Sequence, residues 1–96
     1  MQVVVVKFSD GGSLYYLDGV QDDSIQSDGF LLERLVGHTL ESYEVLWIEP
    51  EDEDNPEPFW DVEAQRTVDD LLRHIVAHPY LVHSSDLANV TARVNA

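Results

Sequence analysis

The sequence predicts an α+β fold, in which an N-terminal β-hairpin belongs to a small, mainly antiparallel sheet of three or four strands with two or three helices packed on it. Two observations predict this class. A run of β-branched residues near the N-terminus is followed by a glycine turn, and a later stretch places apolar residues at helical spacing. Strand-like and helix-like stretches alternate over 96 residues, a length typical of one domain, residues 1–96.

The hairpin is predicted from residues 1–19. Residues 3–6 are four consecutive valines, and a β-branched run without alternation is typical of a strand covered on both faces. Gly11 and Gly12 supply the turn, because glycine adopts positive φ without strain. Residues 14–17 form the second strand, which ends at Asp18-Gly19.

A short helix and a third strand are predicted next. Residues 21–28 are polar and acidic and read as a loop, and either Ser27 or Asp28 can cap the helix that follows. Apolar residues recur at three- and four-residue spacing over 30–36, and Gly37 is a typical helix stop. Residues 43–48 alternate as a strand, with Trp47 on one face and Leu46 on the other.

The clearest helix is predicted over residues 68–77. Thr67 can cap it, with Asp70 three residues later, and the apolar stripe has a period of 3.6 residues up to the stop before Pro79. Residues 80–82 are expected to form a short strand. Ser84 or Ser85 can cap a final helix, while the alternation of residues 90–94 equally permits a strand.

Charge restricts the function more than any motif does. The chain has 19 acidic residues and five Lys or Arg, a net charge of −14, which excludes binding of nucleic acid by phosphate neutralisation and disfavours docking to anionic lipid. It has no cysteine, so disulfides and thiol chemistry are excluded. We expect a cytoplasmic protein, because neither a long apolar run nor a basic, apolar leader is found.

The acids gather in residues 49–58, EPEDEDNPEP, where six of ten residues are acidic and three are proline. An even spread of the net charge would give about one charge per 400 Å² of surface, against about one per 100 Å² for duplex DNA. Imitation of a nucleic acid therefore requires clustering. Such a loop can present carboxylates where a basic partner expects phosphates. The alternatives are a solvated loop, or a calcium loop, which is disfavoured because Pro56 stands where the third ligand is required and no glycine follows it.

Aromatic residues flank this acidic loop. Trp60 is a candidate interface anchor, whereas Trp47, on a strand, is expected in the core. The predicted partner-binding residues are the loop acids, this tryptophan and two acids of the earlier loop: Glu49, Glu51, Asp52, Glu53, Asp54, Glu57, Trp60, Asp22 and Asp23.

Histidines offer a weaker candidate site. His74 and His78 share one side of the predicted helix with Asp70, and His83 follows, a spacing compatible with zinc or nickel. Histidines at a helix C-terminus are also explained by the helix dipole. Ser84 reads better as a cap than as a nucleophile beside His83, so we expect no catalytic residue, metal or cofactor.

These features are compatible with three functions. The first is a small, acidic, non-catalytic inhibitor that occupies the basic nucleic-acid-binding surface of a partner, comparable in size and charge alone to phage anti-CRISPR, anti-restriction and nuclease-immunity proteins. The second is an acid-rich domain whose charge serves solubility, as in halophiles. The third is a histidine-based metal-binding protein.

Overall fold

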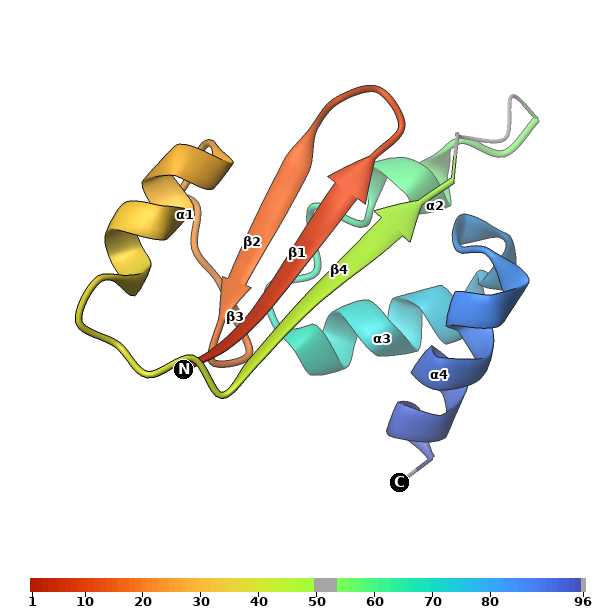
Figure 1. The fold of residues 1–96 in the computed structure, drawn as a ribbon. Coiled ribbons are helices and arrows are strands. Elements are labelled where there is room, and N and C mark those ends of the chain that lie inside the picture. The colour runs from red at the N-terminus through yellow and green to blue at the C-terminus, as the bar shows by residue number, and fades with distance from the viewer. Residues whose placement is uncertain (50–53, 96) are drawn as a thin grey trace.

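The computed structural model describes residues 1–49 and 54–95 (Figure 1). Along the chain the elements are β1 (Gln2–Phe8), β2 (Ser13–Leu17), β3 (Val20–Gln21), α1 (Asp28–Leu35), β4 (Ser42–Ile48), α2 (Glu57–Trp60), α3 (Val68–Ala77), the 3-10 helix η1 (Pro79–Leu81) and α4 (Ser84–Val94). The predicted α+β class and the N-terminal hairpin are confirmed. Glu51, Asp52 and Glu53 lie outside the described residues, and the predictions on them stay predictions.

The sheet of the described residues has the strand order β3-β2-β1-β4. β1 pairs antiparallel with β2, and β2 with β3, as a mainly antiparallel sheet requires. β4 instead pairs parallel with β1, with Val45 opposite Val5. Parallel neighbours need a crossover connection, and the chain makes it through α1. The carboxyl ends of β1 and β4 therefore lie at the same end of the sheet (Figure 1).

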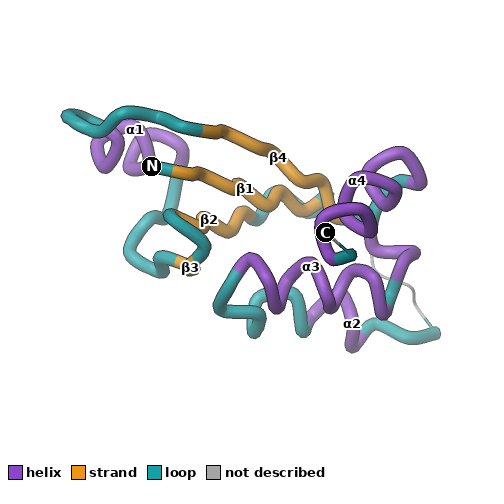
Figure 2. The backbone as a smooth tube through the Cα atoms, turned by 90° about the horizontal axis from the view of Figure 1, so that it is seen from below, coloured by secondary structure: helices purple, strands orange, loops and turns teal. Residues whose placement is uncertain are grey.

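Helices cover the two faces of the sheet unequally. Figure 2 shows α1 on one side of the sheet, and α2 and α3 on the other. On the side of α3, one buried cluster includes Val4, Val6, Tyr16, Leu46, Ile48, Leu71, Leu72, Ile75 and Val90. On the side of α1, a smaller cluster contains Val3, Val5, Tyr15, Ile25 and Leu31. The valine run is thus buried on both faces, as predicted.

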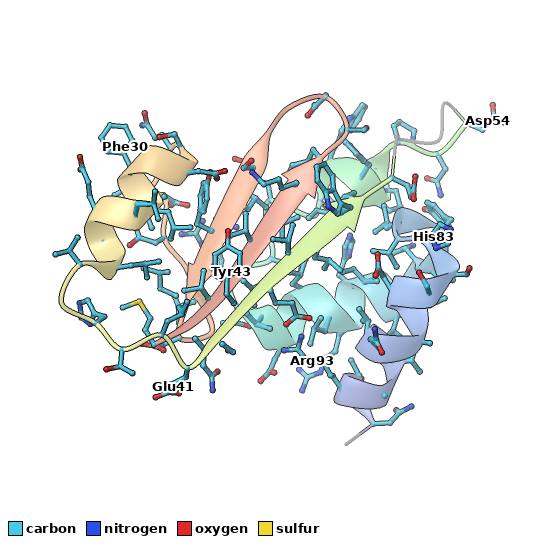
Figure 3. The ribbon with its side chains drawn as sticks, viewed as in Figure 1. Phe30, Glu41, Tyr43, Asp54, His83 and Arg93 are labelled. Carbon is cyan, nitrogen blue, oxygen red and sulfur yellow. The ribbon has the colours of Figure 1, made fainter. Side chains whose placement is uncertain are left out.

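The cover on the α1 side stops short of β4. Tyr43, Val45 and Trp47 lie on that face, and all three are exposed, Trp47 by 56%; Figure 3 shows Tyr43 on this open face. Leu46 and Ile48 point to the other face and are buried. The predicted alternation is right, but the expectation that Trp47 belongs to the core is wrong, because α1 packs over β1 and β2 alone.

The predicted caps of the first and third helices are present. Ser27 caps α1, since its Oγ accepts the Phe30 N–H at 3.4 Å, and Gly37 has the positive φ of +82° that ends the helical segment. Thr67 caps α3, and its Oγ1 accepts the Asp70 N–H at 3.1 Å. α3 then buries its apolar stripe against the sheet.

The C-terminal part differs from two predictions. Residues Pro79–Leu81 form a 3-10 helix rather than a strand, because Pro79 begins a tight turn in which the Leu81 N–H donates to the His78 carbonyl at 3.0 Å. Residues Ser84–Val94 are helical, which settles the choice left open. The cap of this helix is His83, whose Nδ1 accepts the Ser85 N–H at 3.3 Å, and not a serine.

A buried glutamine ties the hairpin to the segment before α3. Gln21 Nε2 donates to the Tyr16 hydroxyl and to the Glu63 carbonyl, both at 3.2 Å, and its Oε1 accepts from Arg66. The Tyr16 hydroxyl donates to the Gln65 carbonyl at 2.6 Å. Residues 63–66 are thereby held against the sheet, which fixes the position of α2 and α3. Within the described chain, every helix is too short or too polar to cross a lipid bilayer.

Candidate binding site at the acidic end of the sheet

The described acids of residues 49–63 lie at the end of the sheet where β1 and β4 both finish. We call this region the acidic end and define it by Asp10, Glu49, Asp54, Glu57, Asp61 and Glu63. The turn between β1 and β2 and the helix α2 also lie there (Figure 1), and Figure 3 places Asp54 at its outer tip. In the sequence, residues 49–63 hold eight of the 19 acids and no Lys, Arg or His.

An aromatic cleft opens at the acidic end, between the β1–β2 turn and α2. Its volume is about 460 Å³. Phe8 and Phe59 line it with their rings edge to face and their centroids 5.4 Å apart. Trp60 also lines it and is 60% exposed, while Asp10 and Glu63 contribute the carboxylates of its lining. The cleft therefore combines one exposed tryptophan and two partly buried phenylalanines with negative charge.

Short-range contacts hold α2 in place beside the cleft. Pro58 is buried, and its carbonyl accepts a hydrogen bond from His74 Nε2 of α3 at 2.7 Å. Val62, just after α2, is fully buried in the main core. Phe59 and Trp60 are thus presented by a segment that is anchored on both sides, although α2 itself is a single turn.

Each Lys and Arg of the chain pairs with an acid that does not line the cleft. Lys7 pairs with Asp28 at 3.0 Å, Arg34 with Asp22 at 2.9 Å and Arg66 with Asp23 at 2.8 Å. Arg73 pairs with Asp70, and Arg93 with Glu44. These five side chains are all the Lys and Arg of the sequence. The ion pairs thus match acids outside the acidic end, and the excess of negative charge is greatest there.

Asp22 and Asp23, predicted as partner contacts, lie in a neighbouring cleft of about 400 Å³ that shares Glu63 with the first. Hydrogen bonds from Ser24 lower the pKa of Asp22, and Arg34 lowers it further. The hydrogen bond from Arg66 lowers the pKa of Asp23. Both carboxylates are therefore ionised, but each already faces an arginine.

The other predicted contacts divide into two groups. Glu49, Asp54, Glu57 and Trp60 lie at the acidic end as the structure describes it. Glu51, Asp52 and Glu53 belong to the same stretch of sequence and lie outside the described residues. Of the predicted set, Trp60 alone lines the cleft among the described residues, and the carboxylates beside it there are Asp10 and Glu63.

Asp10 and Glu63 are the site residues that the sequence did not reveal. They are 53 positions apart in the chain. Asp10 lies in the turn of the predicted hairpin, where a polar residue needs no functional explanation. Glu63 follows the acidic loop and belongs to no recognisable motif. Only the packing of α2 against the end of β1, through Phe8 and Phe59, brings them to one cleft.

The histidines are used in three separate contacts. His74 donates to Pro58, its ring lies 4.9 Å from that of His78, and His83 caps α4. Within residues 1–49 and 54–95, no three His, Asp or Glu side chains are grouped closely enough to hold a metal ion. The described geometry gives the histidine-based metal hypothesis no support.

Comparison with protein-family models, with curated proteins and with solved structures finds no match to this chain.

Proposed function

We propose that the protein is a small, non-catalytic inhibitor that binds the basic nucleic-acid-binding surface of a partner and keeps nucleic acid out of it. One observation supports this most: exposed Trp60 lies beside carboxylates at the acidic end, while the cations of the chain are paired elsewhere. The proposal places the protein with anti-CRISPR, anti-restriction and nuclease-immunity inhibitors in kind, and in the cytoplasm, where such partners act.

The two components of the site have different tasks. Concentrated carboxylates steer a basic partner and raise its association rate by about 10–10³-fold at low salt. Exposed ion pairs contribute only about 0.2–1 kcal/mol each, so affinity also needs buried apolar area. Truncation of an aromatic anchor at the centre of an interface costs about 2 kcal/mol or more, and Trp60 is placed to be such an anchor.

The alternative, in which the charge serves solubility alone, predicts acids spread evenly over the surface. Exposed acids do occur on other elements, such as Glu33 on α1 and Asp69 on α3. However, eight of the 19 acids fall within residues 49–63 without one cation among them. This distribution favours a directed negative surface.

The proposal is tested by capture and competition. The protein is immobilised, exposed to a nuclease-treated extract of its source organism, and the captured protein is purified and titrated with its nucleic acid. We expect the captured protein to bind nucleic acid, and free inhibitor to raise its apparent Kd for nucleic acid in proportion to inhibitor concentration.

Two charge-matched double variants make this test specific. Glu57→Lys with Asp61→Lys changes the acidic end, and Glu33→Lys with Asp69→Lys makes the same change of net charge on α1 and α3. We expect the first pair to abolish competition and the second to leave it nearly intact. Equal competition by both variants, or capture of no nucleic-acid-binding protein, would overturn the proposal.

A further inference from the structure

We infer that the cleft between the β1–β2 turn and α2 receives an arginine side chain of the partner. The inference rests on the proposed function for its biological setting, and on the lining of the cleft for its chemistry. The cleft is lined by Phe8, Phe59 and Trp60, with Asp10 and Glu63 as its carboxylates. A planar cation complements this combination of surfaces.

The aromatic lining suits a flat, weakly hydrated cation. A guanidinium group stacks on aromatic faces and is attracted by the ring quadrupole, most strongly by tryptophan. Trp60 offers 60% of its surface for such a contact, and the edge-to-face pair of Phe8 and Phe59 gives the cleft a fixed apolar wall. A volume of about 460 Å³ also lies within the range of about 300–1,000 Å³ that is typical of ligand pockets.

The carboxylates supply the partner charge for the same group. Asp10 is oriented by its own turn, because its Oδ1 accepts the Gly12 N–H at 2.9 Å. Glu63 lines the cleft as well, although it also interacts electrostatically with Arg66. Guanidinium binds carboxylate oxygens in a planar fork, whereas an ammonium group acts as a point charge. Arginine is therefore favoured over lysine.

The chain does not fill this position with its own cations. Lys7 precedes Phe8 in β1, but the alternation of the strand sends its side chain to the opposite face, where it pairs with Asp28. The four arginines pair with Asp22, Asp23, Asp70 and Glu44. Within residues 1–49 and 54–95, no Lys or Arg forms an ion pair with Asp10 or Glu63, although Arg66 interacts with Glu63 in addition to its pair with Asp23. The negative charge that remains at the cleft is complemented by a cation of another molecule.

The second tryptophan provides a matched control. Trp47 is 56% exposed, nearly as much as Trp60, but it lies on β4 beside Val45 and opposite Lys7 in the strand register. It therefore offers an exposed indole whose strand neighbours are apolar or basic. Trp47→Phe leaves Trp60 as the only tryptophan of the chain, and Trp60→Phe leaves only Trp47.

The probe is a short amidated and acetylated peptide with one arginine flanked by glycines, compared with its lysine and citrulline versions. Each is titrated into the Trp47→Phe variant while tryptophan fluorescence and the indole N–H resonance are followed. We expect saturable shifts with arginine, a several-fold weaker affinity for lysine, and no binding of the uncharged citrulline peptide. The Trp60→Phe variant should show no saturable shift of Trp47.

Conservative changes then test the carboxylates. Asp10→Asn and Glu63→Gln should each weaken the arginine peptide by about 3–10-fold, whereas Glu33→Gln with Asp69→Asn should change its affinity less than twofold. Backbone amide spectra confirm that each variant is folded. Equal affinity for the arginine and citrulline peptides, or an equal response of the two tryptophans, would overturn the inference.

The two proposals fail separately. Suppose that a nucleic-acid-binding partner is captured and that the protein competes with nucleic acid for it, but Trp60 does not respond to the arginine peptide. This result would overturn the arginine cleft and leave the inhibitor function. Saturable arginine binding at Trp60, without any nucleic-acid-binding partner, would uphold the chemistry of the cleft and overturn the inhibitor function.

Discussion

Asp28 joins the start of α1 to the sheet through hydrogen bonds from two side chains. Its carboxylate accepts the Tyr15 hydroxyl at 2.8 Å and the Lys7 ammonium at 3.0 Å. The hydrogen bond from Tyr15, followed by that from Lys7, lowers the pKa of Asp28, and the same carboxylate raises the pKa of Lys7. Burial, more than the contact with Asp28, raises the pKa of Tyr15. A negative group at the first turn of a helix also interacts favourably with the helix dipole.

This arrangement predicts a pH-dependent contribution to stability. Because the pKa of Asp28 is lowered in the folded state, its contribution is complete above the pKa of the unfolded state, near 4, and is lost as the pH falls through the lower, folded pKa. We expect Asp28→Asn to lower the free energy of unfolding by about 1 kcal/mol at pH 7. This value is small for a charged hydrogen-bonded group because the Asp28 side chain is exposed and solvent screens its charge.

The measurement is urea unfolding of both proteins from pH 7 to pH 2.5. The difference in the free energy of unfolding between wild type and Asp28→Asn should narrow below about pH 4, because the wild-type carboxylate becomes protonated. A gap that stays constant down to pH 2.5 would show that the ionised carboxylate does not provide this stability.

Among the elements, α3 contributes most to the main core and also positions the site. Its buried stripe packs under the sheet, and His74 near its C-terminal end donates to Pro58 of α2. Its N-terminus is capped by Thr67, whose backbone also forms an isolated bridge to Val20 of β3. A substitution that disrupts α3 is therefore expected to displace α2 and the cleft as well.

We predict that Thr67→Ala lowers the free energy of unfolding by about 1 kcal/mol, because the hydroxyl that accepts the Asp70 N–H is lost. Thr39→Ala is the matched control, since Thr39 is exposed and contributes its carbonyl, not its side chain, to the N-terminal amine. Thermal and urea unfolding measure both variants. A loss for Thr39→Ala equal to that for Thr67→Ala would contradict the role of the cap.

At the scale of the whole molecule, the charge is unevenly distributed. The ion pairs of Lys7 and the four arginines neutralise acids on β4, in the loop before α1, on α1 and on α3. Residues 49–63 have no such cation among them. Repulsion between like charges is therefore greatest at the acidic end, and it depends on salt because exposed charges are screened.

We predict that Glu57→Lys with Asp61→Lys stabilises the fold at about 20 mM salt by about 0.5 kcal/mol or more relative to Glu33→Lys with Asp69→Lys. At about 1 M salt, where the Debye length is about 3 Å, this difference should vanish. Urea unfolding at the two salt concentrations measures it. Equal stabilisation by both pairs would indicate an even charge distribution, and unfolding of the wild type at low salt would favour the halophile alternative.

The local features of this protein were determined by the sequence alone. The hairpin of residues 3–17, the caps Ser27 and Thr67, and the amphipathic α3 all follow from periodicity and from contacts within a few residues. The acidic segment is likewise visible in the sequence. The local prediction of a short strand at 80–82 is nevertheless wrong, because three apolar residues after a proline fit a tight turn as well as a strand.

Long-range features were decided only by the tertiary structure. The parallel pairing of β4 with β1 set which ends of the strands meet, and the partial cover by α1 left Trp47 exposed. The packing of α2 on β1 placed Asp10 and Glu63 in one cleft. The tertiary structure also paired Arg34 with Asp22 and Arg66 with Asp23. The physical reason is that sequence pattern fixes which face of an element is apolar, whereas the neighbour that covers this face is selected by the packing of the whole chain.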